Sequence, residues 1–271
     1  MTLEEMEAKL DAKDQEAAKL WMSMARDALV YSTPLFSLQN TIDGERLDLA
    51  GCGTFIRKGE RYFILTARHV WDDILKNGDA VGVALREVHD HRYFIETNAI
   101  TPYGPEAPRE WNDSGPDIVA LEIPLNAVGS IKAMRGFYEM EGGLKAMVTG
   151  NRNEAYLLMG TPSVLGAYTP QHASVQIYGM WEGAISPFTK GEWDYFDFKG
   201  ALPEGTPDNT FGGVSGGGLW RVQIYPHPDR NEVASTIILE GVAFYQLGTT
   251  GGKGVIRCHG MDSIREVLES L

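Results

Sequence analysis

The spacing of apolar and polar positions changes after about thirty residues, and this change divides the chain into two unequal parts. Between residues 3 and about 29, apolar side chains recur at steps of three and four, as they do on one face of a helix. Thr2 and Glu5 have the spacing of a capping box at the start of this helix. The apolar stripe consists of Leu3, Met6, Leu10, Ala17, Leu20, Met24 and Ala28. We expect such a stripe to pack on the chain's own domain, with a partner protein or a second copy of the chain as the alternative.

From Tyr31 onward, short runs of β-forming residues alternate with turn residues such as Lys58-Gly59 and Asn77-Gly78. Many short strands at this spacing predict a sandwich or a barrel. The expected strands are 50–57, 62–66, 80–85, 93–97, 118–123, 145–149, 155–159, 174–179, 195–198, 217–223, 237–246 and 254–258. Residues 100–116 are rich in proline, glycine and charge and predict a surface loop. A closing helix is expected over 260–271, with Asp262 as its N-cap.

Composition and charge narrow the classes of partner. The formal net charge of -13 repels a phosphate backbone, so we expect no nucleic-acid partner. The first residues lack the basic and apolar regions of a secretory signal, and no run approaches the ~18 apolar residues of a membrane span, so no membrane association is expected. The two cysteines, Cys52 and Cys258, are typical of reduced thiols in a cytoplasmic protein, with a single bridge between them as the open alternative.

Three short stretches carry candidate chemistry. Residues 63–70 (FILTARHV) form an apolar strand that runs into a turn at His69. In residues 115–121 (GPDIVAL), Asp117 begins a strand of buried character, where a carboxylate needs a partner. In residues 211–219 (FGGVSGGGL), Ser215 stands among glycines, whose backbone freedom lets successive N–H groups point at one spot.

Each stretch alone is weak, because a lone histidine is usually structural and a Gly-Ser loop is usually only a turn. Together they are much more specific. The chain order His, Asp, Ser is one of three in which a Ser-His-Asp triad occurs. The separations are 48 residues from His69 to Asp117 and 98 from Asp117 to Ser215, enough for a barrel of strands in each interval.

These motifs resemble those of the trypsin-like serine peptidases of chymotrypsin fold, particularly the bacterial, disulfide-poor type. Residues 65–70 (LTARHV) are similar to the family's histidine motif, 117–121 (DIVAL) to its aspartate motif and 213–217 (GVSGG) to its Gly-X-Ser-Gly-Gly motif. Residues 51–55 resemble the first strand of the family's fold and 239–245 the strand that lines its substrate pocket. The resemblance covers residues 35–271.

The resemblance implies an all-β fold of two six-stranded antiparallel β-barrels, with an added N-terminal helix and a C-terminal helix. The expected domains are an N-terminal helical extension over 1–30, a first β-barrel over 31–130, and a second β-barrel with the C-terminal helix over 131–271. The implied activity is that of a serine endopeptidase, which hydrolyses a protein or peptide substrate through an acyl-enzyme. The N-terminal helix is left as a further surface for a partner or for self-association.

The resemblance also assigns roles to individual residues. His69 is the expected general base, Asp117 orients it, and Ser215 is the nucleophile. The backbone N–H groups of Gly213 and Ser215 form the expected oxyanion hole. The substrate-binding residues implied by the resemblance are Asn209 at the base of the pocket and Ala243, Phe244, Tyr245 and Gln246 along the substrate backbone.

Three positions depart from the family pattern. Val214 stands where secreted trypsins carry an aspartate that pairs with a newly cut N-terminus, so activation by N-terminal cleavage is not expected. Gly218 stands where proline is usual, which loosens the loop. Arg68 replaces a small residue beside His69.

Other functional patterns are weaker. His89 and His91 share a strand face, but no third ligand with zinc-like spacing accompanies them. Residues 251–254 (GGKG) lack the remaining positions of a phosphate-binding loop, and the aspartates at 72, 73 and 79 do not fit a calcium loop. We therefore expect no metal and no cofactor. The alternative to an enzyme is a protease-like module, catalytically weak, that binds peptides or proteins.

Overall fold

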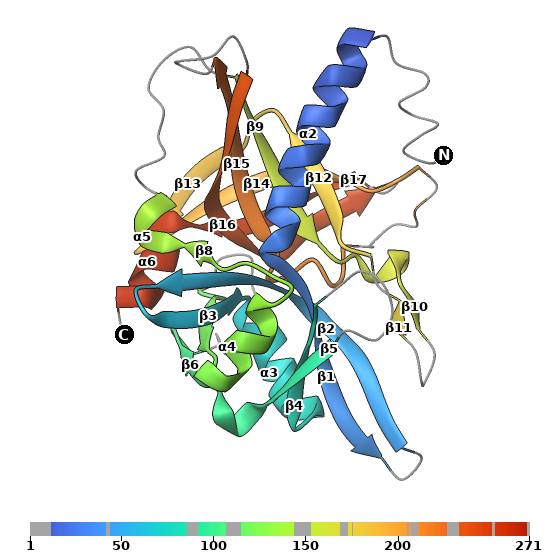
Figure 1. Ribbon diagram of the computed structural model, residues 1–271, viewed down its shortest axis with the longest axis vertical. Coiled ribbons are helices and arrows are strands. Elements are labelled where there is room, and N and C mark those ends of the chain that lie inside the picture. The colour runs from blue at the N-terminus through green and yellow to red at the C-terminus, as the bar shows by residue number, and fades with distance from the viewer. Residues whose placement is uncertain are drawn as a thin grey trace.

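The computed structural model describes residues 12–41, 44–85, 92–106, 115–143, 153–168, 173–174, 176–204, 206, 211–226, 233–250 and 253–269. These residues are mostly β-structure, arranged in two large antiparallel sheets with helices at their margins. The first sheet occupies the lower half of the molecule in Figure 1 and the second sheet the upper half. In the described residues, no helix combines the length and the apolar character that crossing a membrane requires.

The first sheet contains eight strands in the order β5-β4-β1-β2-β3-β7-β6, with β8 added in parallel to β2. The strands are β1 (Ser32–Thr41), β2 (Gly44–Lys58), β3 (Arg61–Thr66), β4 (Ala80–Ala84), β5 (Arg92–Glu96), β6 (Thr101–Tyr103), β7 (Val119–Glu122) and β8 (Tyr138–Glu139). The two ends of this order, β5 and β6, are joined in the chain by the short 3-10 helix η1 (Thr97–Ala99). A connection this short brings the two end strands back toward each other.

The second sheet contains seven strands in the order β12-β9-β15-β16-β17-β14-β13. They are β9 (Asn153–Gly160), β12 (Tyr178–Glu182), β13 (Ser186–Lys190), β14 (Trp193–Ala201), β15 (Gly218–Pro226), β16 (Val233–Thr250) and β17 (Lys253–Gly260). Its end strands, β12 and β13, are also consecutive in the chain, with residues 183–185 between them. A separate two-stranded sheet pairs β10 (Ala167–Tyr168) with β11 (Ala173–Ser174).

The observed fold agrees with the expected β-class and differs from the expectation in detail. One of the sheets is curled into a half-barrel, and the strands number eight and seven where six were expected in each. The expected surface loop over 100–116 contains strand β6. Strand β1 was not expected, because Pro34 and several polar residues interrupt its pattern, yet Leu35 and Phe36 are fully buried in it. The expected strand at 145–149 lies outside the described residues.

Strand β3 is an apolar run that is buried along most of its length. Tyr62 and Ile64 pack into a core formed within the first sheet, with Val119 and Leu121 of β7. Phe63 and Leu65 point to the other face and pack against residues of the second sheet, such as Trp220. The strand is therefore covered on both faces, and its carboxyl end, which leads to His69, is held between the two sheets.

The helix α2 (Ala12–Val30) packs on the second sheet, across the upper half of Figure 1. Met24 and Ala28 are buried in the core shared by the two sheets, and Trp21 contacts Trp181 of β12 edge to face at 5.0 Å. The expected packing on the chain's own body is confirmed for these residues. Leu3, Met6 and Leu10, the first part of the predicted stripe, lie outside the described residues.

Each of the other helices follows a strand in the chain. They are α3 (Arg68–Asn77), α4 (Leu125–Lys132), α5 (Met140–Gly143) and α6 (Met261–Glu269), with the short 3-10 helix η3 (Ser163–Leu165). Helix α6 is the expected closing helix, but Asp262 lies inside its first turn, so the predicted N-cap is wrong. Its start is held by Asp194 of β14, whose carboxylate accepts hydrogen bonds from the backbone N–H groups of Asp262 and Ser263 at 3.2 and 2.7 Å.

Candidate active site

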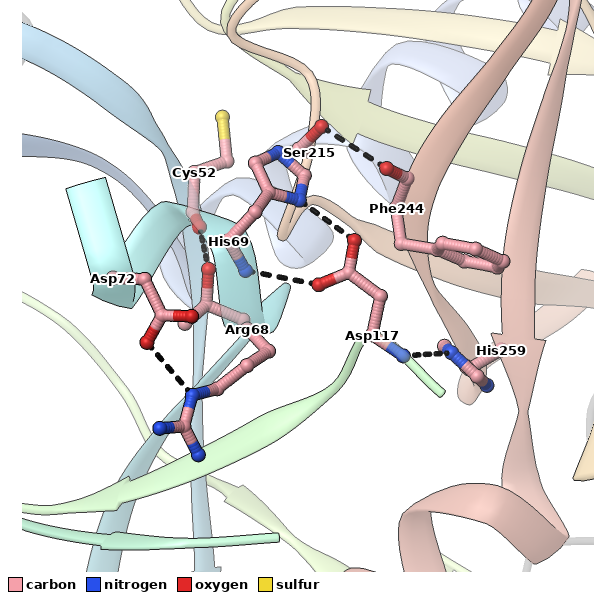
Figure 2. Close-up of polar contacts among 9 residues, drawn as sticks. Cys52, Arg68, His69, Asp72, Asp117, Ser215, Phe244 and His259 are labelled. Atoms are coloured by element: carbon pink, nitrogen blue, oxygen red, sulfur yellow. Dashed lines mark hydrogen bonds and ion pairs between the residues drawn. The ribbon is translucent and has the colours of Figure 1, made fainter. Parts of the chain in front are cut away.

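His69 and Asp117 come from the first sheet and form a direct pair. Strand β3 ends at Thr66 and α3 begins at Arg68, so His69 lies in the first turn of a helix that follows a buried strand. Asp117 lies just before β7, the neighbour of β3. The His69 Nδ1 atom is 2.7 Å from Asp117 Oδ2, and the His69 backbone N–H donates to Asp117 Oδ1 at 2.9 Å (Figure 2).

These two hydrogen bonds fix the orientation of the imidazole. Asp117 is buried, so its carboxylate depends on these donors. Since a carboxylate accepts hydrogen bonds, the Nδ1 atom of His69 carries the proton that faces it. The neutral ring then has its unprotonated nitrogen, Nε2, on the side away from Asp117, where it can act as a base.

Ser215 lies in the segment 211–217, which leads into strand β15 of the second sheet. Gly213 and Gly216 have φ angles of +89° and +88°, values that side-chain-bearing residues rarely adopt. A Cβ atom on Gly216 would lie 1.9 Å from the carbonyl oxygen of Cys52 and 2.2 Å from Thr66 Oγ1. The glycines therefore let the Ser215 segment approach the first sheet closely.

Backbone hydrogen bonds hold this segment in place. The Ser215 carbonyl accepts from the Cys52 backbone N–H at 2.7 Å, and the Gly216 N–H donates to the Ala243 carbonyl at 2.7 Å. Thr66 Oγ1 donates to the Cys52 carbonyl at 2.6 Å, which ties the end of β3 to the same point. Cys52 thus connects the serine segment to the strand that ends before His69.

The three predicted triad residues are brought to one place, at the junction of the two sheets. Figure 2 places the His69 ring between the Asp117 carboxylate and the Ser215 side chain. The Ser215 hydroxyl donates to the Phe244 carbonyl at 3.5 Å, the long end of the range for a hydrogen bond. The hydroxyl is therefore only weakly held and can rotate toward a base.

The two N–H groups predicted for an oxyanion hole belong to this segment. Among the described residues, neither the Gly213 nor the Ser215 backbone N–H has a hydrogen-bond acceptor. The Gly213 carbonyl is turned toward Cys52, whose Sγ lies 3.1 Å from it and 3.1 Å from Thr161 Oγ1. Burial raises the pKa of the Cys52 thiol to about 12, so it stays protonated.

Both cysteines are free and buried, so the alternative of a Cys52–Cys258 bridge is wrong. Cys52 lies at the serine segment, whereas Cys258 lies on β17 in the core of the second sheet. Burial raises the pKa of the Cys258 thiol as well. Neither thiol is placed to react.

The predicted substrate-binding residues Ala243, Phe244, Tyr245 and Gln246 lie on β16. Strand β15 pairs with β16 only as far as Val242, while β17 continues along the other side. Beyond Ala243, this side of β16 consequently has no partner strand among the described residues. Asn209, the predicted base of the pocket, lies outside the described residues.

The residues that depart from the family pattern are accommodated without contact to the pair. Val214 is buried in the apolar core of the second sheet. Arg68 points away from His69 and binds Asp72, with 2.8 Å between Arg68 Nε and Asp72 Oδ1, and the Pro105 carbonyl (Figure 2). Gly218 is buried, and a Cβ there would meet Trp220 Nε1 at 2.8 Å, so this site has no room for proline.

One histidine at this site was not predicted from the sequence. His259, at the end of β17, is buried, and its Nε2 accepts a hydrogen bond from the Asp117 backbone N–H at 3.0 Å. The Phe244 ring stacks on it with 4.3 Å between ring centroids. Burial lowers the pKa of His259 to about 4. Nothing in its surroundings in the sequence, Arg-Cys-His-Gly, indicates a contact with a residue 142 positions earlier.

The site offers little to a metal ion. Within the ranges that the structure describes, no three His, Cys, Asp or Glu side chains gather as a ligand set. His89 and His91, the weak zinc candidates, lie outside those ranges.

The sequence matches no protein-family model and no curated protein.

Proposed function

We propose that this chain is a serine endopeptidase of trypsin-like type, which hydrolyses peptide bonds through an acyl-enzyme. The observation that carries the proposal is the His69–Asp117 pair, with 2.7 Å between His69 Nδ1 and Asp117 Oδ2, next to a serine in a glycine-rich segment. The residues occur in the chain order of one known triad, and they come from two different sheets. A histidine–aspartate pair with only a structural role would not require a serine segment beside it.

The proposed architecture is a pair of β-barrels of chymotrypsin type. Two features support it. Each sheet begins and ends on strands that are consecutive in the chain, β5 with β6 and β12 with β13. The site lies at the junction between the two sheets, which is where the resemblance puts the catalytic cleft.

The proposed reaction follows from the groups present. Ser215 Oγ attacks the substrate carbonyl carbon while its proton moves to His69 Nε2, and the carbonyl electron pair moves onto oxygen. The Gly213 and Ser215 N–H groups bind that oxyanion. The intermediate then expels the amine, which takes the proton from His69. Water repeats the sequence on the acyl-enzyme, releases the acid product and regenerates Ser215.

The partner of the reaction is a protein or peptide in an extended conformation. The side of β16 beyond Ala243 offers backbone groups to such a chain, which could add as a further strand. Tyr245 and Gln246 follow on the same strand and would flank the bound peptide. Because Val214 provides no carboxylate for a new N-terminus, the proposed enzyme needs no N-terminal cleavage.

The free thiols support a reducing location for the proposed enzyme. Cys52 and Cys258 are both buried and unbridged, as is usual in the cytoplasm. A cytoplasmic location is therefore part of the proposal.

The competing function is a protease-like binding module. A cavity of about 360 Å³ between β8, β16 and α6 favours it, since it could hold an apolar side chain of a partner. Its lining includes Tyr138, Leu239 and Leu268 together with the ion-paired Arg221 and Glu240. None of the proposed triad residues lines this cavity.

A serine-directed fluorophosphonate separates the two functions. The wild-type chain is expected to become labelled, and Ser215→Ala is expected to lose all labelling while keeping its circular dichroism spectrum. Ser186→Ala removes an exposed hydroxyl on β13 and serves as the matched control, which should label fully. A wild-type protein that stays unlabelled and cleaves no member of a peptide library would refute the peptidase. Peptide binding by that unlabelled protein would establish the binding module instead.

A further inference from the structure

We propose that His259 is a positioning residue of the active site, which fixes Asp117 by accepting its backbone N–H while the imidazole is neutral. The catalytic consequence of this inference rests on the proposed peptidase function. The contact itself rests on geometry alone. His259 would not touch the substrate; it would act through Asp117 and Phe244.

The contact determines the protonation of His259. A backbone N–H can only donate, so His259 Nε2, at 3.0 Å from the Asp117 nitrogen, must carry a lone pair. The neutral ring therefore has its proton on Nδ1. Among the described residues, Nδ1 has no hydrogen-bond partner, so no acceptor at that nitrogen stabilises the charged form of the ring.

The surroundings leave His259 little freedom to move. Phe244 stacks on one face, and Tyr195 and Trp193 contact the ring with centroids 5.0 and 5.8 Å away. A Cβ on Gly115 would come within 3.0 Å of the ring, so the chain segment before Asp117 lies directly against it. A rigid acceptor of this kind fixes the backbone nitrogen that it binds.

His259 contacts both supports of the triad. Asp117 is bound by His69 through its carboxylate and by His259 through its backbone, so a shift of the backbone would move the carboxylate. Phe244 stacks on His259 through its ring, and its carbonyl accepts from Ser215 Oγ. Figure 2 shows Asp117 between the two histidines.

The geometry also implies a pH limit. The titratable groups that face His259 are Asp117 before β7 and Asp194 and Tyr195 on β14, while β16 presents the uncharged Phe244. Burial outweighs the attraction of the two carboxylates and lowers the pKa of His259 to about 4. A proton on Nε2 would face the Asp117 N–H, two donors in contact, and the anchor would be lost. Below about pH 4, this second proton on His259 therefore lowers activity.

Two substitutions test whether His259 acts as a hydrogen-bond acceptor or only packs in the core. His259→Phe keeps an aromatic ring and removes the acceptor, and we expect kcat to fall roughly 10- to 100-fold with KM little changed, as for small misplacements of a catalytic group. His259→Gln places an amide oxygen near the position of Nε2 and should recover most of kcat. The wild-type kcat should fall more steeply below about pH 4, and this extra loss should be absent from the Gln variant. Equal kcat values in folded Phe and Gln variants, or an unchanged acid slope in the Gln variant, would overturn the proposal.

A second measurement does not depend on turnover. In Ser215→Ala protein with ¹⁵N-labelled histidine, the His259 signals should show protonated Nδ1 and unprotonated Nε2 at pH 7. The low-field proton of the His69–Asp117 hydrogen bond should persist with Gln at 259 and be lost or shifted with Phe. An Nε2-protonated or charged His259 at pH 7, or a His69 signal that neither variant changes, would overturn the inference. If these signals appear as expected but the wild-type chain cleaves and labels nothing, the positioning role stands and the peptidase fails.

Discussion

The two sheets hold their parts of the site by different means. The first sheet supplies His69 and Asp117, and the Asp117 carboxylate holds His69 through hydrogen bonds of 2.7 Å to the ring and 2.9 Å to the backbone N–H. The second sheet supplies Ser215, which backbone hydrogen bonds hold at its carbonyl and at Gly216, while its hydroxyl makes only a 3.5 Å contact.

This difference matches what each part would have to do in the proposed reaction. A general base needs a fixed tautomer and direction, and a directional bond to a buried carboxylate provides both. A nucleophile must rotate between a base and a substrate, so its backbone must be fixed while its side chain stays free. The glycines around Ser215 meet that need, since they pack the backbone closely against Cys52 without adding side chains.

The largest effect is expected from breaking the directional bond in the first sheet. Asp117→Asn puts an NH₂ group where the His69 Nδ1–H needs an acceptor, so the ring is driven to the wrong tautomer. We expect turnover to fall on the order of 10⁴-fold, as in other Ser-His-Asp triads, with the fold retained. Steady-state kinetics on a cleaved peptide measure turnover, and thermal unfolding checks that the fold is retained.

Asp72→Asn is the matched control, because this carboxylate lies nearby and binds Arg68 instead of His69. It should change turnover little. If Asp72→Asn lowered turnover strongly and Asp117→Asn lowered it little, the proposed role of the first sheet in orienting His69 would be wrong.

The second effect tests the backbone support in the second sheet. Gly216→Ala would place a Cβ 1.9 Å from the Cys52 carbonyl oxygen at a φ of +88°, so the segment must shift. We expect a loss of about 2–5 kcal/mol in the free energy of unfolding, together with weaker phosphonate labelling of Ser215. Chemical denaturation and labelling rates measure these losses.

Gly183→Ala is the control for this change, since a Cβ there would meet nothing within 4 Å. It should leave both stability and labelling nearly unchanged. If Gly216→Ala is as mild as the control, the Ser215 backbone is not under the close constraint described above.

The smallest effect on the chemistry is expected from the N-terminal helix, which packs outside both parts of the site. Met24→Ala removes a side chain that is 5% exposed and should cost about 2–4 kcal/mol of stability without raising peptidase activity. Met134→Ala, at 36% exposure, should cost far less. Unfolding curves and peptide cleavage test the pair, and a more active Met24→Ala protein would mean that α2 inhibits the site.

Local patterns in the sequence predicted the three segments that form the candidate site. The apolar run before His69, the strand start at Asp117 and the glycines around Ser215 each reflect short-range constraints, and the structure brings all three segments together. Their catalytic roles stay predictions until labelling and kinetics are done. Strand β1 was missed because Pro34 and polar residues interrupt its apolar run, although polar residues such as Ser32 and Ser37 are buried there.

His259 could not have been found in this way. Its contact with Asp117 depends on how β17 of the second sheet packs against the segment before β7 of the first. Local periodicity in the sequence does not predict that packing. Its burial beside Phe244 likewise results from tertiary packing. Long-range contacts of this kind become visible only in three dimensions.

The distance along the chain between Asp117 and His259 has a consequence for protein synthesis. A ribosome adding about 5–20 residues per second needs on the order of 10 s to make the 142 residues between them. During that interval the nascent chain contains the Asp117 carboxylate but not the acceptor for its backbone N–H. A newly made chain can therefore complete this set of site contacts only after β17 has left the ribosome.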